Sequence, residues 1–109
     1  MSARLTPRVG DFDEQAALAA LGGEGLQPTH WSNGPGEVYA SHSHAYHKVL
    51  YCLRGSIRFE TGAGGQRFEL RPGDRLDVQP GTVHAAVVGP EGVECVEGAR
   101  DLRAAGKGD

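Results

Sequence analysis

Residues 36–55 read GEVYASHSHAYHKVLYCLRG, and three histidines, His42, His44 and His47, fall close together in this stretch. Side chains two apart on a strand leave the same face, roughly 6.5 to 7 Å apart along the chain. Two imidazoles at that spacing can converge on one metal ion, whose bonds to nitrogen are about 2.0 to 2.1 Å long. A polar edge strand that faces water would carry the same pattern, so the pair His42 and His44 does not by itself establish a metal site.

A further histidine, His84, lies about forty residues after His44, in the stretch GDRLDVQPGTVHAAVV of residues 73–88. It interrupts an otherwise apolar segment just after a Pro-Gly turn. A lone histidine in such a strand is more often a hydrogen-bonded core residue than a ligand. Two histidines on one strand and a third on another, however, can supply the three nitrogens of a facial metal site.

The pattern around these two stretches predicts an all-β protein. Seventeen glycines and six prolines punctuate the 109 residues. From Gly55 onward, turn signals recur about every 8 to 10 residues, a spacing typical of an antiparallel sandwich or barrel. The segments 49–53 and 83–88 are apolar on both faces and should lie centrally. Apolar and polar residues alternate in three other segments, as in strands with one buried face: 57–60, 67–70 and 75–78.

The length of the chain fits one domain. Residues 1–12 are expected to form an N-terminal arm, because they show no periodicity. Residues 13–98 should form the domain, with one short helix at 13–21 that Gly22-Gly23 ends. Residues 99–109 are rich in alanine, glycine and charged residues and are expected to form a C-terminal tail.

Charge and apolar runs exclude several classes of partner. The formal net charge is -3, so there is no basic excess to bind nucleic acid. The longest apolar run, 16–21, is too short to cross a membrane, and residues 1–15 do not match a secretory signal. Without export, Cys52 and Cys95 should be reduced thiols, so we expect a cytoplasmic protein.

The two quoted stretches resemble the two sequence motifs of the cupin family. Their glycines and histidines fall in register with both motifs: Gly36, His42, His44 and Gly55 in the first, and Gly73, Gly81 and His84 in the second. The resemblance implies a small β-barrel of the jelly-roll type, a double-stranded β-helix. It also implies one divalent transition metal ion (Fe, Mn, Zn or Ni) held inside the barrel by the three histidines.

The chain departs from the family pattern at one ligand position. In the family, three or four residues separate the second histidine from a metal-binding glutamate, and at those two positions this chain has Lys48 and Val49. Gln79 and Val88 also replace a proline and an asparagine of the second motif. A four-ligand site with a carboxylate is therefore absent. A three-histidine site remains, as in the cupins that resemble thiol or diketone dioxygenases.

Lys48 should share a face with His42 and His44 by strand parity. Two unit charges about 4 Å apart repel by roughly 4 kcal/mol at an effective dielectric constant of about 20, and a divalent ion doubles this. Three outcomes are open. Lys48 reaches the mouth of the barrel and binds an anionic ligand, stays neutral with a lowered pKa, or replaces the metal and leaves an ion-free pocket. We expect the first.

Two further residues are candidates for the site. In a regular strand His47 faces away from His42 and His44 as an outward or hydrogen-bonded histidine, but a β-bulge near residues 45–46 would turn it toward the metal. Cys52 has the parity of His44 and should point into the barrel. There it is either a small buried residue or part of the wall of a ligand pocket.

Tyr39 and Tyr51 have the opposite parity to His42 and His44, so they are expected on the outer face of the barrel. An apolar outer face on a barrel indicates contact with a second copy of the chain. The resemblance to single-domain cupins implies the same, and we therefore expect a homodimer.

Two functions are open. Three neutral imidazoles leave a bound ion its charge and open coordination positions, and Fe(II) in such a site can activate dioxygen. The first hypothesis is therefore an oxygenase-type enzyme that acts on a small polar metabolite. The second is a non-catalytic barrel that binds or senses a small molecule, an anion or a sugar-like compound, with or without metal. Lys48 in place of the glutamate favours the second.

Overall fold

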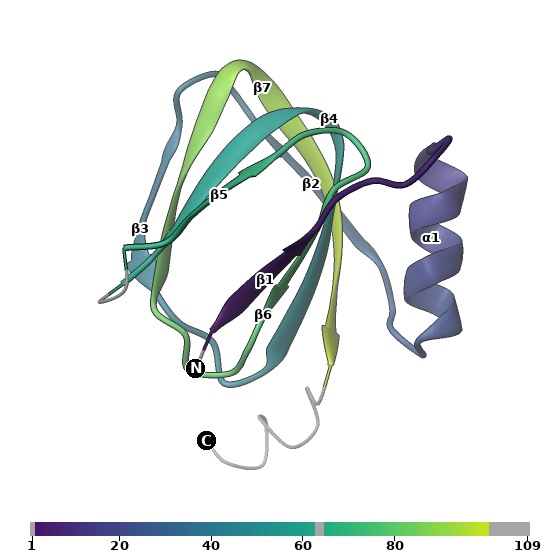
Figure 1. The fold of residues 1–109 in the computed structure, drawn as a ribbon, viewed down its shortest axis with the longest axis horizontal. Coiled ribbons are helices and arrows are strands. Elements are labelled where there is room, and N and C mark those ends of the chain that lie inside the picture. The colour runs from purple at the N-terminus through teal and green to yellow at the C-terminus, as the bar shows by residue number, and fades with distance from the viewer. Residues whose placement is uncertain (1, 63–64, 101–109) are drawn as a thin grey trace.

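The structure is a computed structural model that describes residues 2–62 and 65–100. Over these ranges the chain forms seven strands and one helix (Figure 1). In chain order they are β1 (Ala3–Thr6), α1 (Glu14–Gly23), β2 (Thr29–Asn33), β3 (Val38–His42), β4 (His47–Thr61), β5 (Arg67–Leu70), β6 (Arg75–Val78) and β7 (His84–Arg100). Within the described ranges, no helix is both long enough and apolar enough to span a bilayer.

Two long strands, β4 and β7, form the middle of the barrel. They pair antiparallel along their lengths, from His47 opposite Arg100 to Thr61 opposite His84. The register shifts around Gly55, and both strands bend near their middle, so that each runs up one side of the barrel and down the other (Figure 1). Gly55 permits this close approach: its φ is +74°, and a Cβ there would lie 2.0 Å from the backbone oxygen of Gly92.

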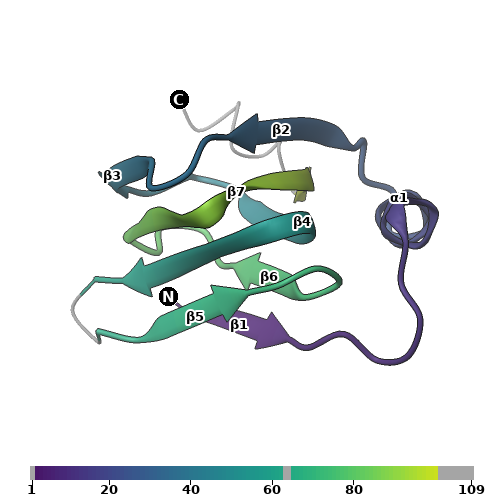
Figure 2. The same cartoon turned by 90° about the horizontal axis from the view of Figure 1, so that it is seen from above.

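The bend divides the remaining strands into two groups. The first half of β4 pairs with β6, which pairs with β1, and the last part of β7 pairs with β2. The second half of β4 pairs with β5, and the first part of β7 pairs with β3. Figure 2 shows β2 and β3 along one side of the barrel and β1 and β5 along the other. This arrangement confirms the expected all-β barrel with one short helix.

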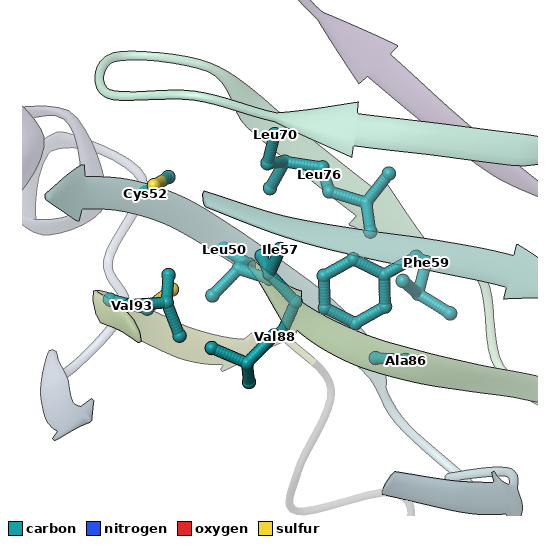
Figure 3. Packing of buried hydrophobic residues seen from close by; sticks show 11 residues of the cluster. Leu50, Cys52, Ile57, Phe59, Leu70, Leu76, Ala86, Val88 and Val93 are labelled. Atoms are coloured by element: carbon teal, nitrogen blue, oxygen red, sulfur yellow. The ribbon is translucent and has the colours of Figure 1, made fainter. Parts of the chain in front are cut away.

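The interior of the barrel is filled by alternate residues of the paired strands. Leu50 and Cys52 point inward from one half of β4, and Ile57 and Phe59 from the other half (Figure 3). The other buried members of this cluster are Leu70, Leu76, Val78, Ala86, Val88, Val93 and Cys95. Every second side chain points inward on the strands of both groups, so the two groups share one core.

A second apolar cluster lies outside the barrel, under α1. The carboxylate of Asp13 accepts a hydrogen bond from the backbone N–H of Ala16 and caps the helix. Ala17 and Leu21 of α1 pack on Val49, Leu53 and Val96 of the barrel. Val49 and Leu53 are the outward side chains that made 49–53 apolar on both faces. The helix therefore covers the outer face of the barrel from which we had expected a homodimer, and that face no longer argues for one.

Several expected boundaries need correction. Residues 1–12 were expected to form an arm, yet β1 lies there and pairs with β6, from Ala3 opposite Val78 to Thr6 opposite Arg75. One of the recurring turn signals is the Gly-Pro-Glu-Gly segment at 89–92, but β7 continues through it to Arg100, past the expected domain end at 98. Most of the expected tail, 101–109, lies outside the described residues.

Candidate metal centre

The three histidines of the two motifs meet at one end of the barrel. His42 ends β3 and lies directly opposite His84, the first residue of β7, while His44 lies in the connection between β3 and β4. Between Tyr39 and His42 the register shifts, because three steps along β3 match two along β7, from Ala86 to His84. This irregularity resets the parity of β3.

The register shift overturns one expectation. Tyr39 was expected on the outer face, but it packs against the inner core and meets the indole ring of Trp31 edge-on, with ring centroids 5.9 Å apart. Tyr51, in the regular first part of β4, lies on the outer face as expected and stacks on Phe12. A one-residue irregularity therefore decides which tyrosine lines the interior.

The imidazole rings of His42, His44 and His84 converge. One ring nitrogen from each lies within 4.8 Å of the other two, and the ring centroids of His42 and His84 are 4.3 Å apart. Nitrogens that bind one ion at about 2.1 Å each can be at most about 4.2 Å apart. The 4.8 Å limit exceeds this by about 0.6 Å, so the three nitrogens would have to approach one another only slightly to share one ion.

Hydrogen bonds orient two of the rings for this role. Nδ1 of His42 lies 2.7 Å from the carbonyl oxygen of Ala40, and Nδ1 of His84 lies 2.8 Å from that of Thr82. A carbonyl only accepts, so each Nδ1 carries the proton and each Nε2 keeps its lone pair for a metal. Within the described residues, Nε2 of His44 and Nε2 of His84 are buried without a hydrogen-bond partner. A divalent ion would satisfy both atoms, so these residues fit a metal site.

The charge state of the histidines suits metal binding. Burial, followed by the nearby positive charge of Lys48, lowers the pKa of His44 to about 4. Burial also lowers the pKa of His84. Both rings are therefore neutral at physiological pH, the form in which imidazole binds a metal ion.

Lys48 points into the barrel, as expected, but its partner was not foreseen. Its Nζ lies 3.4 Å from Oε1 of Glu97 on β7, and the side chains of Lys48 and Glu97 are only 12% and 20% exposed. The indole N–H of Trp31 donates to the same oxygen at 2.6 Å. The ammonium charge is thus balanced by a carboxylate of the chain, an outcome different from the three we had considered.

Glu97 is the cavity residue that sequence reasoning missed. On β7, Val93 and Cys95 face the core, so period-two alternation places Glu97 on the same inward face. The alternation of apolar and polar residues is hard to see in this part of the sequence, because Val96, between Cys95 and Glu97, is also apolar. Val96 faces outward and packs under α1.

A cavity of about 290 Å³ lies beside the histidines. His42, His44, Lys48 and Glu97 supply its polar wall. The rest of the lining is aromatic or aliphatic: Trp31, Tyr39, Tyr46, Ile57, Phe59 and Ala86. Tyr46 also stacks on His44, with ring centroids 4.8 Å apart. The volume is at the small end of ligand pockets, which usually measure about 300 to 1,000 Å³.

The structure does not bring His47 or Cys52 to the cavity. Nε2 of His47 lies 2.9 Å from a carboxylate oxygen of Asp77, so His47 is a hydrogen-bonded histidine outside the cluster. Cys52 is fully buried in the barrel core, directly opposite Cys95, and its Sγ contacts the carbonyl oxygens of Arg54 and Gly55. Both residues are therefore parts of the scaffold in this structure.

Comparisons with known proteins agree with this fold. Residues 29–97 match the Cupin_2 family, the cupin domain. A quercetin 2,3-dioxygenase from Bacillus subtilis is 43% identical over 56 residues, which make up 50% of this chain and 16% of that protein. The matched stretch is thus a small part of the relative's length, about one sixth.

Two solved structures are similar over about two thirds of the chain. One is an uncharacterized conserved protein with a double-stranded beta-helix domain from Klebsiella pneumoniae, with 29% identity and a TM-score of 0.59 over 67% of this chain and 64% of that chain. The other is an RmlC-like cupin from Shewanella frigidimarina, with 24% identity and a TM-score of 0.59 over 68% and 64%. Both structures share the fold, and the family match over residues 29–97, more than half of the chain, shows that the chain belongs to the cupin domain family.

Proposed function

We propose that this cupin binds one divalent metal ion through His42, His44 and His84, beside a cavity that takes a small polar molecule. The observation that carries the proposal is the convergence of three imidazoles whose ring nitrogens lie within 4.8 Å of one another. Fe, Mn, Zn and Ni are the candidate ions, since imidazole suits several transition metals.

The residues around a bound ion would have different roles. The carbonyl oxygens of Ala40 and Thr82 accept hydrogen bonds from Nδ1 of His42 and His84, so Nε2 of each ring would be free to bind the ion. Three neutral ligands leave a bound divalent ion its full charge and open coordination positions, with which it acts as a Lewis acid or, as Fe(II), supports reaction with dioxygen. Tyr46 and Phe59 line the cavity beside the histidines and give it aromatic walls.

The reaction class we favour is oxygenase-type conversion of a small polar molecule. The similarity to a protein named quercetin 2,3-dioxygenase supports this class over half of the chain. The cavity of about 290 Å³ supports a small substrate.

A second candidate function is non-catalytic binding or sensing of a small molecule. It is favoured by Lys48, which stands where the cupin motif carries a metal-binding glutamate and instead pairs with Glu97. Oxygen consumption separates the two functions: an oxygenase consumes dioxygen when its substrate is added, whereas a binding protein changes only its stability.

Metal content tests the proposed function. The protein is purified without a metal-affinity column, loaded separately with Fe(II), Mn(II), Zn(II) and Ni(II), desalted and measured by elemental analysis. We expect about one ion per chain in the wild type and in His30→Ala, because His30 lies away from the cluster and contacts Glu14. His84→Ala should retain little metal, since two imidazoles bind weakly. Folded wild type that retains none of the four ions would contradict the proposal.

A further inference from the structure

The cavity contains a second polar group that metal binding does not use, formed by Trp31, Lys48 and Glu97. We call it the Glu97 cluster. Oε1 of Glu97 accepts from the indole N–H of Trp31 at 2.6 Å and lies 3.4 Å from Nζ of Lys48. The three residues come from three strands, β2, β4 and β7, and all of them line the cavity. The barrel is therefore built to hold this carboxylate in one orientation.

Burying the charged groups of Lys48 and Glu97 lowers the stability of the fold unless other interactions compensate. A carboxylate and an ammonium turned into a barrel lose hydration, and their attraction repays that loss only with good geometry and further hydrogen bonds. Leu50, the residue opposite Glu97 on β4, is fully buried and apolar. Apolar side chains at positions 48 and 97 would extend the core as Leu50 does, without the loss of hydration. The stability of the fold alone therefore does not explain the Glu97 cluster.

Glu97 is placed where a ligand held at the histidines could contact it. Glu97 and Tyr46 line both the cavity and a second hollow that is bordered by Gln27, Pro28 and Gly98. They therefore stand where the two spaces meet, while His42 and His44 line the cavity alone. A molecule held by one end at the histidines would present its other end to Glu97.

We propose that Glu97 is a specificity-determining residue that accepts a hydrogen bond from a neutral hydroxyl group at the outer end of the ligand. This inference rests on the proposed function, because the inner end of the ligand is held at the metal ion. About ten water molecules would fill 290 Å³, at roughly 30 Å³ each. That volume and the aromatic walls fit a single ring that carries hydroxyl groups.

The same geometry disfavours an anionic outer end. Lys48 already faces Glu97, so its charge is balanced and does not attract a carboxylate. A carboxylate placed beside Glu97 would be repelled and would leave Glu97 without a donor from the ligand. The cluster therefore selects neutral hydroxyl compounds against organic acids of the same shape, which reverses our expectation that Lys48 binds an anion.

Two matched probes test this selectivity. 3,4-Dihydroxybenzyl alcohol and 3,4-dihydroxybenzoate share the ring and the metal-binding diol and differ only in a hydroxymethyl or a carboxylate group at the far end. Binding to the zinc-loaded protein is measured by isothermal titration calorimetry, with zinc as an ion that supports no redox reaction. We expect the wild type to bind the alcohol at least about tenfold more tightly than the acid, the range of one charged hydrogen bond.

Three variants separate a selective role from a structural one. Glu97→Gln keeps an oxygen for Trp31 but leaves Lys48 unbalanced, so the preference should reverse toward the acid. Lys48→Met should keep the alcohol and weaken the acid further. Glu94→Gln is the matched control, because Glu94 lies on the same strand but pairs with Arg54 outside the cavity at 2.7 Å. It should behave as the wild type does.

The outcomes distinguish the inference from the function on which it rests. A wild type that takes up no zinc would contradict the proposed function and the inference with it. A zinc-loaded wild type that binds neither probe or prefers the acid, or a zinc-loaded Glu97→Gln variant with the wild-type preference, would overturn the role of Glu97 alone. If Glu97→Gln does not fold, Lys48→Met decides, because equal losses for both probes would indicate a structural role only.

Discussion

At the bend of β4 and β7 the interior of the barrel is apolar, whereas at the free ends of the same two strands it is polar. Near the bend, Cys52 and Cys95 are fully buried, and Ile57 and Val93 belong to the same core cluster (Figure 3). At the ends, the inward positions of β7 carry His84 and Glu97. Both regions use the same period-two pattern, but the inward side chains toward the ends of β7 lie at the cavity, whereas those near the bend are enclosed by the core.

This difference shows how a small barrel combines stability with a site. Residues near the bend lose all contact with water, and apolar side chains gain most there. Residues at the ends keep an opening, so imidazoles and an ion pair are tolerated if they are hydrogen-bonded. The bend should therefore determine folding, and the open end should determine binding. Each prediction below tests this separation.

The largest effect is expected for Gly55→Ala at the bend. The new Cβ would meet the backbone oxygen of Gly92 at 2.0 Å, in a residue whose φ is +74°. Strain and overpacking together should lower the free energy of unfolding by about 3 kcal/mol or more, measured by urea denaturation. Gly25→Ala is the control: its φ is +77° but no atom lies within 4 Å of the new Cβ, so about 1 kcal/mol is expected. Equal losses would contradict the importance of the close approach.

The next largest effect is the difference in the free energy of unfolding between a core truncation and a histidine substitution. Leu76→Ala removes a fully buried side chain and should cost about 2 to 5 kcal/mol. His42→Ala at the open end removes one hydrogen bond to Ala40 and should cost about 1 kcal/mol when a chelator keeps metal away. Urea denaturation with a chelator checks both. A larger loss for His42→Ala would mean that the open end is part of the folding core.

A smaller effect concerns an ionic network on the outside of the barrel, where Arg75 contacts Glu24 and Asp77. The hydrogen bond from Arg75 lowers the pKa of Glu24. Burial alone would raise the pKa of Asp77, but hydrogen bonds from Arg75 and His47 outweigh it and lower the pKa. Both carboxyl groups therefore stabilise the fold above their unfolded values of 4.5 and 3.8, and this stability is lost as pH falls through the lower folded values.

The test compares the wild type with Arg75→Met. Urea denaturation at neutral pH and at about pH 3.5 should show the wild type losing more stability in acid than the variant does. The variant should thus be less stable at neutral pH and approach the wild type in acid. A difference that stays constant with pH would show that Arg75 acts through packing instead of charge.

The sequence allowed the barrel and the three histidines to be predicted, because both depend on local patterns. Glycine positions, turn spacing and strand alternation are properties of neighbouring residues, and the two motifs carry His42, His44 and His84. Expectations failed where distant segments decide the outcome. Three features depend on residues that are far apart in the sequence, so no local pattern predicts them. They are the pairing of β1 with β6, the register shift that turns Tyr39 inward and the contact of Lys48 with Glu97.

The most direct test of the account is the position of a metal ion in crystals of the zinc-loaded protein. An anomalous-difference map recorded at the zinc absorption edge should show one strong peak about 2.0 to 2.1 Å from a ring nitrogen of each of His42, His44 and His84. A peak at His47 and Asp77 or at His30 and Glu14, with none among the three converging rings, would contradict the central claim.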